Sequence, residues 1–188
     1  HGPRLISHLA KPFTAKEMIT IGDLQVTPFF KYHDASDPHS FVINCNGISI
    51  GVLTDIGTVC EEVIHHFKQC HAVFLEANYD ATMLENGKYP IHLKNRIRGG
   101  HGHLSNKEAL DLFITHRSPN LSHLLLSHLS KENNSPEMVE ALFKQYANGI
   151  TIAIAYRHRA TEIFSISQGT NNHAISKVSS SLQLGLFE

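Results

Sequence analysis

Residues 41–57 read FVINCNGISIGVLTDIG, and this stretch decides the fold class. Two short apolar runs at 41–44 and 48–54 are separated by Asn46-Gly47, a strong hairpin signal because both residue types tolerate a positive φ angle. Asp55-Ile56-Gly57 follows the second run. The stretch therefore predicts two antiparallel strands with a carboxylate directly after the second one.

Downstream of this hairpin, helix and strand signals alternate. Thr58-Val59-Cys60-Glu61 and Ser105-Asn106-Lys107-Glu108 match the capping box that opens a helix, and Ser135-Pro136 places a cap residue before a proline. The sequence predicts helices at 58–68, 105–115 and 136–147, and strands at 23–30, 41–44, 48–54, 72–77, 121–127, 150–155 and 161–166. This order is typical of an α/β fold with a mixed sheet.

The composition fits one folded domain, predicted over residues 1–167, followed by a polar linker and a C-terminal peptide at 168–188. Apolar residues make up 41% of the 188 residues, and 16 basic residues balance 17 acidic ones, so net charge does not attract nucleic acid or membranes globally. No apolar run approaches the roughly 18 residues of a membrane span. Three cysteines without a C-x-x-C pair indicate a reducing, cytoplasmic location.

Three side chains able to bind metal follow predicted strands. They are His33, Asp55 and His128, in a chain with 15 histidines. Strand ends of an α/β fold meet at one rim, where ligands usually bind, and imidazole with carboxylate suits zinc or manganese. Taken singly, each histidine also fits a surface residue, and Asp55 before Gly57 also fits a turn.

Five motifs resemble the YycJ/WalJ-type branch of the metallo-β-lactamase-fold hydrolases, in the right order from about residue 13 to residue 167. They are His33-Asp34-Ala35-Ser36-Asp37-Pro38, Gly51-Val52-Leu53-Thr54-Asp55-Ile56-Gly57, Leu75-Glu76-Ala77-Asn78-Tyr79-Asp80, Gly102-His103-Leu104-Ser105-Asn106 and His128-Leu129-Ser130-Lys131-Glu132-Asn133-Asn134. The resemblance implies an αβ/βα sandwich with two divalent metals, zinc or manganese. It also implies a nuclease, notably a 5′→3′ DNA exonuclease.

By this resemblance, His33 is a ligand of the first metal, Asp55 bridges both metals and His128 binds the second. Gly102-His103 is similar to an element of the related β-CASP nucleases whose histidine contacts the scissile phosphate. The family's first signature, His-x-His-x-Asp-His, does not occur in these 188 residues. We therefore expect that the first strands and four further ligands lie upstream, and that this chain alone holds metal weakly and is inactive.

Residues near these motifs are candidates for supporting roles. Asp34 and Asp37 can orient His33 through its second ring nitrogen, although Asp37-Pro38 also fits simple turn chemistry. Asp55 and His103 are the expected catalytic residues, with His103 donating a proton to the phosphate or the leaving group. Ser105 opens a helix whose N–H groups can bind an anion, or it serves only as a cap.

A window without acidic residues, 86–107, carries five cations. They are Lys88, Lys94, Arg96, Arg98 and Lys107. Such a stripe can track a nucleic-acid backbone, and we expect Lys94, Arg96 and Arg98 to contact DNA together with His103 and Ser105. The alternative is an ordinary solvated face.

The C-terminal peptide resembles the pentapeptide that binds the bacterial DNA sliding clamp. Gln183, Leu184, Leu186 and Phe187 carry the likeness, after a linker with few apolar residues. A polar linker presenting Leu and Phe to an apolar pocket suits such binding. The alternative is a terminal element that packs on the core.

Together these features predict a metal-dependent phosphodiester hydrolase, a DNA 5′→3′ exonuclease of DNA repair. Two alternatives stay open at this stage. One is another metallo-hydrolase with an RNA or small-ester substrate, and the other is a non-catalytic interaction module that has lost its metal.

Overall fold

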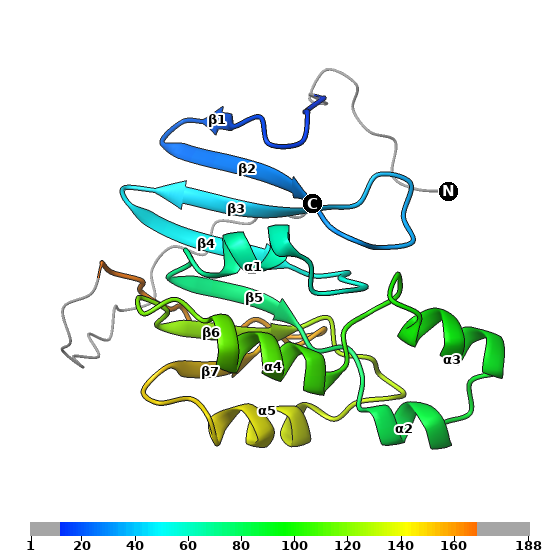
Figure 1. Ribbon diagram of the computed structural model, residues 1–188. Helices are drawn as coiled ribbons and strands as arrows, with labels where there is room; N and C mark the ends of the chain where they lie inside the picture. The colour runs from blue at the N-terminus through cyan, green and yellow to red at the C-terminus, as the bar shows by residue number, and fades with distance from the viewer. Residues whose placement is uncertain (1–11, 169–188) are drawn as a thin grey trace.

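The computed structural model describes residues 12–168 as a single mixed sheet with helices. The predicted clamp peptide lies outside the described residues. Seven strands follow one another in chain order across the sheet (Figure 1). They are β1 (Ile19–Ile21), β2 (Leu24–Phe30), β3 (His39–Cys45), β4 (Ile48–Leu53), β5 (Ala72–Glu76), β6 (His123–Ser127) and β7 (Thr151–Ile154).

The sheet changes from antiparallel to parallel at β4. Strands β1 to β4 pair antiparallel, and β4 to β7 pair parallel. The predicted hairpin is confirmed, since Asn46 and Gly47 join β3 to β4 with φ angles of 48° and 78°. The α/β fold with a mixed sheet is therefore confirmed, and the three parallel strands β4, β5 and β6 end at the same edge.

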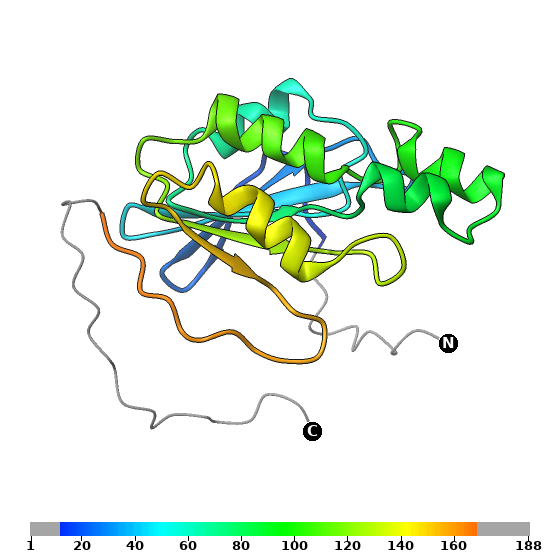
Figure 2. The ribbon, with the colours of Figure 1, turned by 90° about the horizontal axis from the view of Figure 1, so that it is seen from below.

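Five helices join or follow the parallel strands. They are α1 (Glu61–Phe67), α2 (Ala81–Asn86), α3 (Ile91–Arg98), α4 (Asn106–His116) and α5 (Pro136–Lys144). Helices α1, α4 and α5 cover one face of the sheet, whereas α2 and α3 lie beyond the edge to which β5 points (Figures 1 and 2). In the described part of the chain, no helix is long and apolar enough to cross a membrane.

Two of the three predicted helix starts are confirmed. Ser105 forms a complete capping box with Glu108, and Ser135 accepts a hydrogen bond from the Met138 N–H. The predicted box at Thr58 is wrong, because α1 begins at Glu61 and its N-cap Cys60 makes no side-chain bond. The Thr58 hydroxyl instead donates to the carbonyl of Gly100 at 2.7 Å, which ties this turn to the loop after α3.

Register places the core between the sheet and its helices. On the helix-covered face, Val42, Val73, Leu124 and Ile152 occupy one row across β3 and β5 to β7, and each is at most 8% exposed. The opposite face also carries apolar side chains. The last described residues run back along that face (Figure 2), where the Phe164 ring lies 5.2 Å from that of His123.

The predicted strand at 161–166 is wrong. These residues form no strand, and Ile163 is 96% exposed, because the chain leaves the sheet after β7 and finds no pairing partner there. Three further elements, β1, α2 and α3, were not predicted. Helix α3 buries none of its residues and has no side-chain cap at Pro90, so no capping signal marks its start in the sequence.

Candidate metal centre

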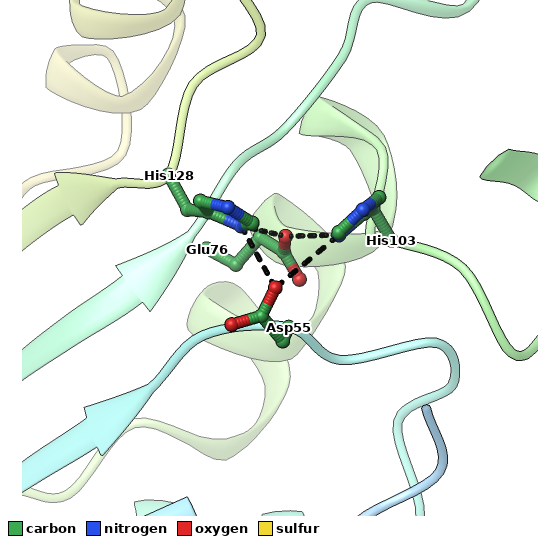
Figure 3. A group of neighbouring side chains, drawn as sticks. All are labelled: Asp55, Glu76, His103 and His128. Atoms are coloured by element: carbon green, nitrogen blue, oxygen red, sulfur yellow. Dashed lines mark hydrogen bonds and ion pairs between the residues drawn. The ribbon is translucent and has the colours of Figure 1, made fainter. Parts of the chain in front are cut away.

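Three neighbouring parallel strands each deliver one side chain to the same edge of the sheet. Asp55 follows β4, Glu76 is the last residue of β5, and His128 follows β6 (Figure 3). Register places Leu53 beside Leu75, and Glu76 beside Ser127, so the three strand ends are level. Two carboxylates and an imidazole are thus brought together by strands far apart in the sequence.

The backbone bends sharply at two of these positions. Asp55 and His128 have φ angles of 54° and 56°, in the left-handed region that non-glycine residues seldom occupy. Hydrogen bonds hold both turns, since the Ile56 N–H donates to Glu76 Oε2 at 2.6 Å and Asn78 Nδ2 donates to the His128 carbonyl at 2.7 Å. Backbone strain of this kind is concentrated at functional sites in proteins.

Glu76 is the fully buried hub of the cluster. Its Oε1 lies 2.8 Å from His103 Nδ1 and 2.7 Å from His128 Nδ1 (Figure 3). Burial favours a raised pKa for Glu76, but hydrogen bonds from the two imidazoles and the Ile56 N–H outweigh it, and the pKa falls below its ordinary value. The hydrogen bond to Glu76 raises the pKa of His128 against the opposing effect of burial.

Asp55 completes a compact set of possible ligand atoms. Its Oδ1 lies 3.4 Å from His128 Nδ1 and 3.9 Å from His103 Nδ1. One donor atom from each of Asp55, Glu76, His103 and His128 lies within 4.8 Å of all the others. Ligands about 2.1 Å from one tetrahedral ion are about 3.4 Å apart. The chemistry of the set suits a divalent metal, and the separation between Asp55 and His128 matches this spacing, whereas the 2.7 and 2.8 Å contacts to Glu76 are hydrogen bonds.

His33 joins the cluster from the loop after β2. Its Nε2 lies 3.7 Å from Asp55 Oδ1, and its Nδ1 donates to the carbonyl of Gly102 at 2.9 Å. That bond fixes the tautomer and leaves the Nε2 lone pair facing Asp55. A side chain at Gly102 is excluded, because a Cβ there lies 2.2 Å from the Ile97 carbonyl oxygen. His33, Asp55 and His128 therefore converge as expected, and their role as ligands stays a prediction.

Lys31 supplies a positive charge behind the centre. It is only 6% exposed, and its Nζ donates to the carbonyl of Thr54 at 2.6 Å. Burial lowers the pKa of Lys31, while Asp55 and Glu76 act in the opposite direction. Its ammonium partly balances the charge of these two carboxylates, and its hydrogen bond to Thr54 also supports the turn at Asp55.

Sequence reasoning missed Glu76 and Asn134. No catalytic or metal-binding role was predicted for Glu76 from the sequence. A carboxylate that ends an apolar strand between two other candidate strands is nevertheless a usable signal of a site residue. Asn134, which the sequence marks only as the last residue of a motif, is buried and donates to the carbonyls of Ala77 and Asn78 and to Asn106 Oδ1. It thereby anchors the loop after His128 to β5 and α4.

The predicted supporting residues lie partly elsewhere. Asp34 forms an ion pair with Arg96 and lies 3.5 Å from His33 Nε2. The pKa of Asp34 is lowered, chiefly by its hydrogen bond from Arg96. Asp37 is 79% exposed and pairs with His39, so the structure does not bring it to His33.

The basic window is largely neutralised by local partners. Arg96 pairs with Asp34, Arg98 with Glu85 and Lys107 with Asp111, while Lys94 donates to the Glu85 carbonyl. Ser105 is buried in its capping box, so the structure does not leave its N–H free for an anion. His103 keeps Nε2 free, because Nδ1 engages Glu76.

The centre opens into a cavity of about 410 Å³. His103 and His128 line it together with Asn78, Tyr89 and Arg96. The edges of both imidazole rings that do not contact Glu76 are thus accessible to a small ligand or to the end of a polymeric one.

The chain is similar in sequence to curated exodeoxyribonucleases. The chain is 31% identical to exodeoxyribonuclease YycJ of Bacillus anthracis over 133 residues, which cover 71% of this chain and 50% of that protein. It is 34% identical to exodeoxyribonuclease WalJ of Streptococcus pneumoniae serotype 2 over 119 residues, 63% of this chain and 44% of that protein. The chain thus spans about half the length of the relatives that it matches.

Comparison with solved structures identifies the fold. The metallo-β-lactamase-fold protein YhfI of Bacillus subtilis aligns with a TM-score of 0.56 and 15% identity, over 76% of this chain and 51% of that one. No family model matches the chain. The predicted resemblance to the YycJ/WalJ branch and the predicted metallo-β-lactamase fold are both confirmed.

Proposed function

We propose that this chain, which has the metallo-β-lactamase fold, provides the metal centre of a metal-dependent phosphodiester hydrolase. The enzyme is a DNA exonuclease that degrades strands from 5′ to 3′. The observation that carries the proposal is the convergence of Asp55, Glu76, His103 and His128 around one point beside a cavity. The likeness to exodeoxyribonucleases supports DNA as the substrate. We further propose two divalent metals, zinc or manganese, and a cytoplasmic role in DNA repair.

Three residues of the chain are proposed as metal ligands. Asp55, His33 and His128 are the groups that would hold the metals, which when bound activate water and neutralise phosphate charge. His128 offers Nε2 or, after releasing the proton shared with Glu76, Nδ1. Asp55 carries two oxygens and is the group able to serve two ions.

Glu76 and His103 form a proton-transfer pair. The hydrogen bond between His103 Nδ1 and Glu76 fixes the orientation of the ring and leaves Nε2 directed at the cavity. Protonated His103 would then donate from Nε2 to the leaving oxygen of the phosphodiester. Glu76 itself acts through the two imidazoles, since it is buried away from the cavity.

The proposal includes two expectations from the sequence. The 188-residue chain alone is expected to bind metal weakly and to be inactive, because His33, Asp55 and His128 are only three of the ligands that the family resemblance implies. The peptide of Gln183, Leu184, Leu186 and Phe187 is expected to bind the sliding clamp, which would place the enzyme at replicating or repaired DNA.

The decisive test is DNA degradation with and without Asp55. We expect the native gene product to release nucleotides from 5′-phosphorylated duplex DNA in the presence of Mn²⁺. The 188-residue chain is assayed in parallel. Asp55→Asn is expected to lower the rate about 100-fold or more, because it removes a charge at the centre. Asp37→Asn is the matched control, since Asp37 is exposed and pairs with His39 rather than with a residue of the cluster. Degradation that survives Asp55→Asn would refute the proposal.

A further inference from the structure

A second cavity of about 680 Å³ lies beside the candidate centre. Residues 128–131 and Arg157 line both cavities, so this segment forms their common wall. The rest of the second cavity comes from the start of α5 and from residues 154–159 at and after the end of β7. A ligand in this cavity therefore lies next to His128.

The second cavity is lined by basic side chains that form no close ion pair within the described residues. Lys131, Arg157, His158 and Arg159 line it, together with His128 and without any carboxylate. Among residues 12–168, no ion pair joins Lys131, Arg157 or Arg159 to an acidic side chain, in contrast to the paired cations at 86–107. Within the described part of the chain, the one hydrogen bond of Arg157 is a long one, 3.4 Å, to the Leu129 carbonyl. The pKa of the Glu137 carboxyl is lowered, chiefly by its hydrogen bond from Ser135 and in part by nearby Arg159. The charges most available to an anion are therefore those of Lys131 and Arg157.

The same cavity offers a flat surface. The Arg159 guanidinium carbon lies 3.7 Å from the centroid of the Tyr156 ring, and both groups line the cavity with the apolar side chains of Leu129, Pro136 and Ile154. A stacked guanidinium and aromatic ring is the kind of surface on which nucleobases stack without regard to sequence. The volume also lies within the about 300–1,000 Å³ of small-molecule sites.

We propose that this cavity, the nucleotide pocket (residues 128–131, 134, 136 and 154–159), binds the terminal nucleotide of the substrate strand. The base lies against Tyr156 and Arg159, and the phosphate lies against Lys131 and Arg157. The inference rests on the proposed function for its substrate class. It shifts the nucleic-acid contact from the cations at 86–107 to those around the end of β7.

Binding of a nucleotide tests the pocket without any metal or turnover. Because the chain has no tryptophan, titration calorimetry of the 188-residue chain in a chelator is suitable, with dAMP, deoxyribose 5-phosphate and deoxyadenosine as probes. We expect dAMP to bind more tightly than either part alone. Tyr156→Ala should weaken dAMP about 10-fold and leave deoxyribose 5-phosphate unchanged, whereas Arg157→Gln should weaken both phosphates.

Matched controls lie outside the pocket. Tyr146→Ala removes another half-exposed tyrosine, and Lys88→Gln removes a cation of the 86–107 window. Both should leave dAMP binding unchanged, with thermal unfolding showing that every variant is folded. No dAMP binding by the unmodified chain, or equal weakening by Tyr156→Ala and Tyr146→Ala, overturns the inference.

The outcome is separable from that of the proposed function. Nucleotide binding that depends on Tyr156, in a gene product that does not degrade DNA, supports the pocket and counts against the nuclease. DNA degradation that depends on Asp55, without nucleotide binding in the pocket, supports the nuclease and overturns the pocket.

Discussion

Replacing Glu76 by glutamine should destabilise the protein by about 2–4 kcal/mol near pH 6. The carboxylate is fully buried and accepts from His103, His128 and the Ile56 N–H. Hydrogen bonds to a charged group contribute about 1.5–3 kcal/mol each. Water replaces part of this contribution, because the side chains of His103 and His128 are 23% and 40% exposed.

The pH dependence of this loss follows from the two pKa shifts. The pKa of Glu76 is lowered, so its contribution is present above the ordinary value of 4.5 and is lost as pH falls through the folded-state value. The pKa of His128 is raised, so its contribution is complete below the ordinary value of 6.5 and is lost as pH rises through the folded-state value. The difference in the free energy of unfolding between wild type and Glu76→Gln should therefore be largest between the ordinary values of 4.5 and 6.5.

Urea unfolding in a chelator at about pH 3, 6 and 9 measures this difference directly. Glu85→Gln is the control, since Glu85 is exposed and pairs with Arg98 at the surface, where such a pair contributes at most about 1 kcal/mol. Equal losses for the two variants at pH 6, or a Glu76→Gln loss that does not vary with pH, would show that Glu76 is not the hub described above.

Two further predictions concern packing and reactivity. Gly102→Ala should lower the unfolding temperature clearly, because its Cβ would lie 2.2 Å from the Ile97 carbonyl oxygen. The control Gly22→Ala meets nothing within 4 Å and should show only the smaller effect of its positive φ angle. Equal shifts of the unfolding temperature by calorimetry would contradict this prediction. Burial raises the pKa of the Cys70 thiol to about 12. Iodoacetamide near pH 8 should therefore label the half-buried Cys45 and Cys60 first and Cys70 only after unfolding, as followed by mass spectrometry. Rapid labelling of Cys70 in the folded protein would show that its thiol is accessible.

The elements that local chemistry determines were predictable. Asn46-Gly47 and the Ser105 capping box were found because their signals lie within a few residues, and β4 to β6 were found as apolar runs. The proximity of Asp55 and His128 followed from the rule that parallel strands end at one edge. The residues at 161–166 have a strand-like composition, but only a neighbouring strand makes such a segment pair.

Features that depend on tertiary contacts were not predictable. Glu76 becomes a hub only because His103 arrives from the loop before α4, 27 residues downstream. The basic window appeared free because its acidic partners, Asp34 and Glu85, lie outside it in the sequence. The pocket wall around Tyr156 and Arg159 forms where the chain leaves the sheet, and no periodicity marks that point.

The left-handed turns at Asp55 and His128 set stability against activity. Holding a non-glycine residue in this conformation costs about 1–2 kcal/mol, which glycine at either position would relieve. Glycine would also delete a side chain of the metal centre. Glycine at His128 would also remove the hydrogen bond to buried Glu76, so the gain in stability is expected at position 55 alone. Directed evolution that selects for heat resistance alone is therefore expected to place glycine at position 55 and to yield a more stable protein that lacks the Asp55 carboxylate.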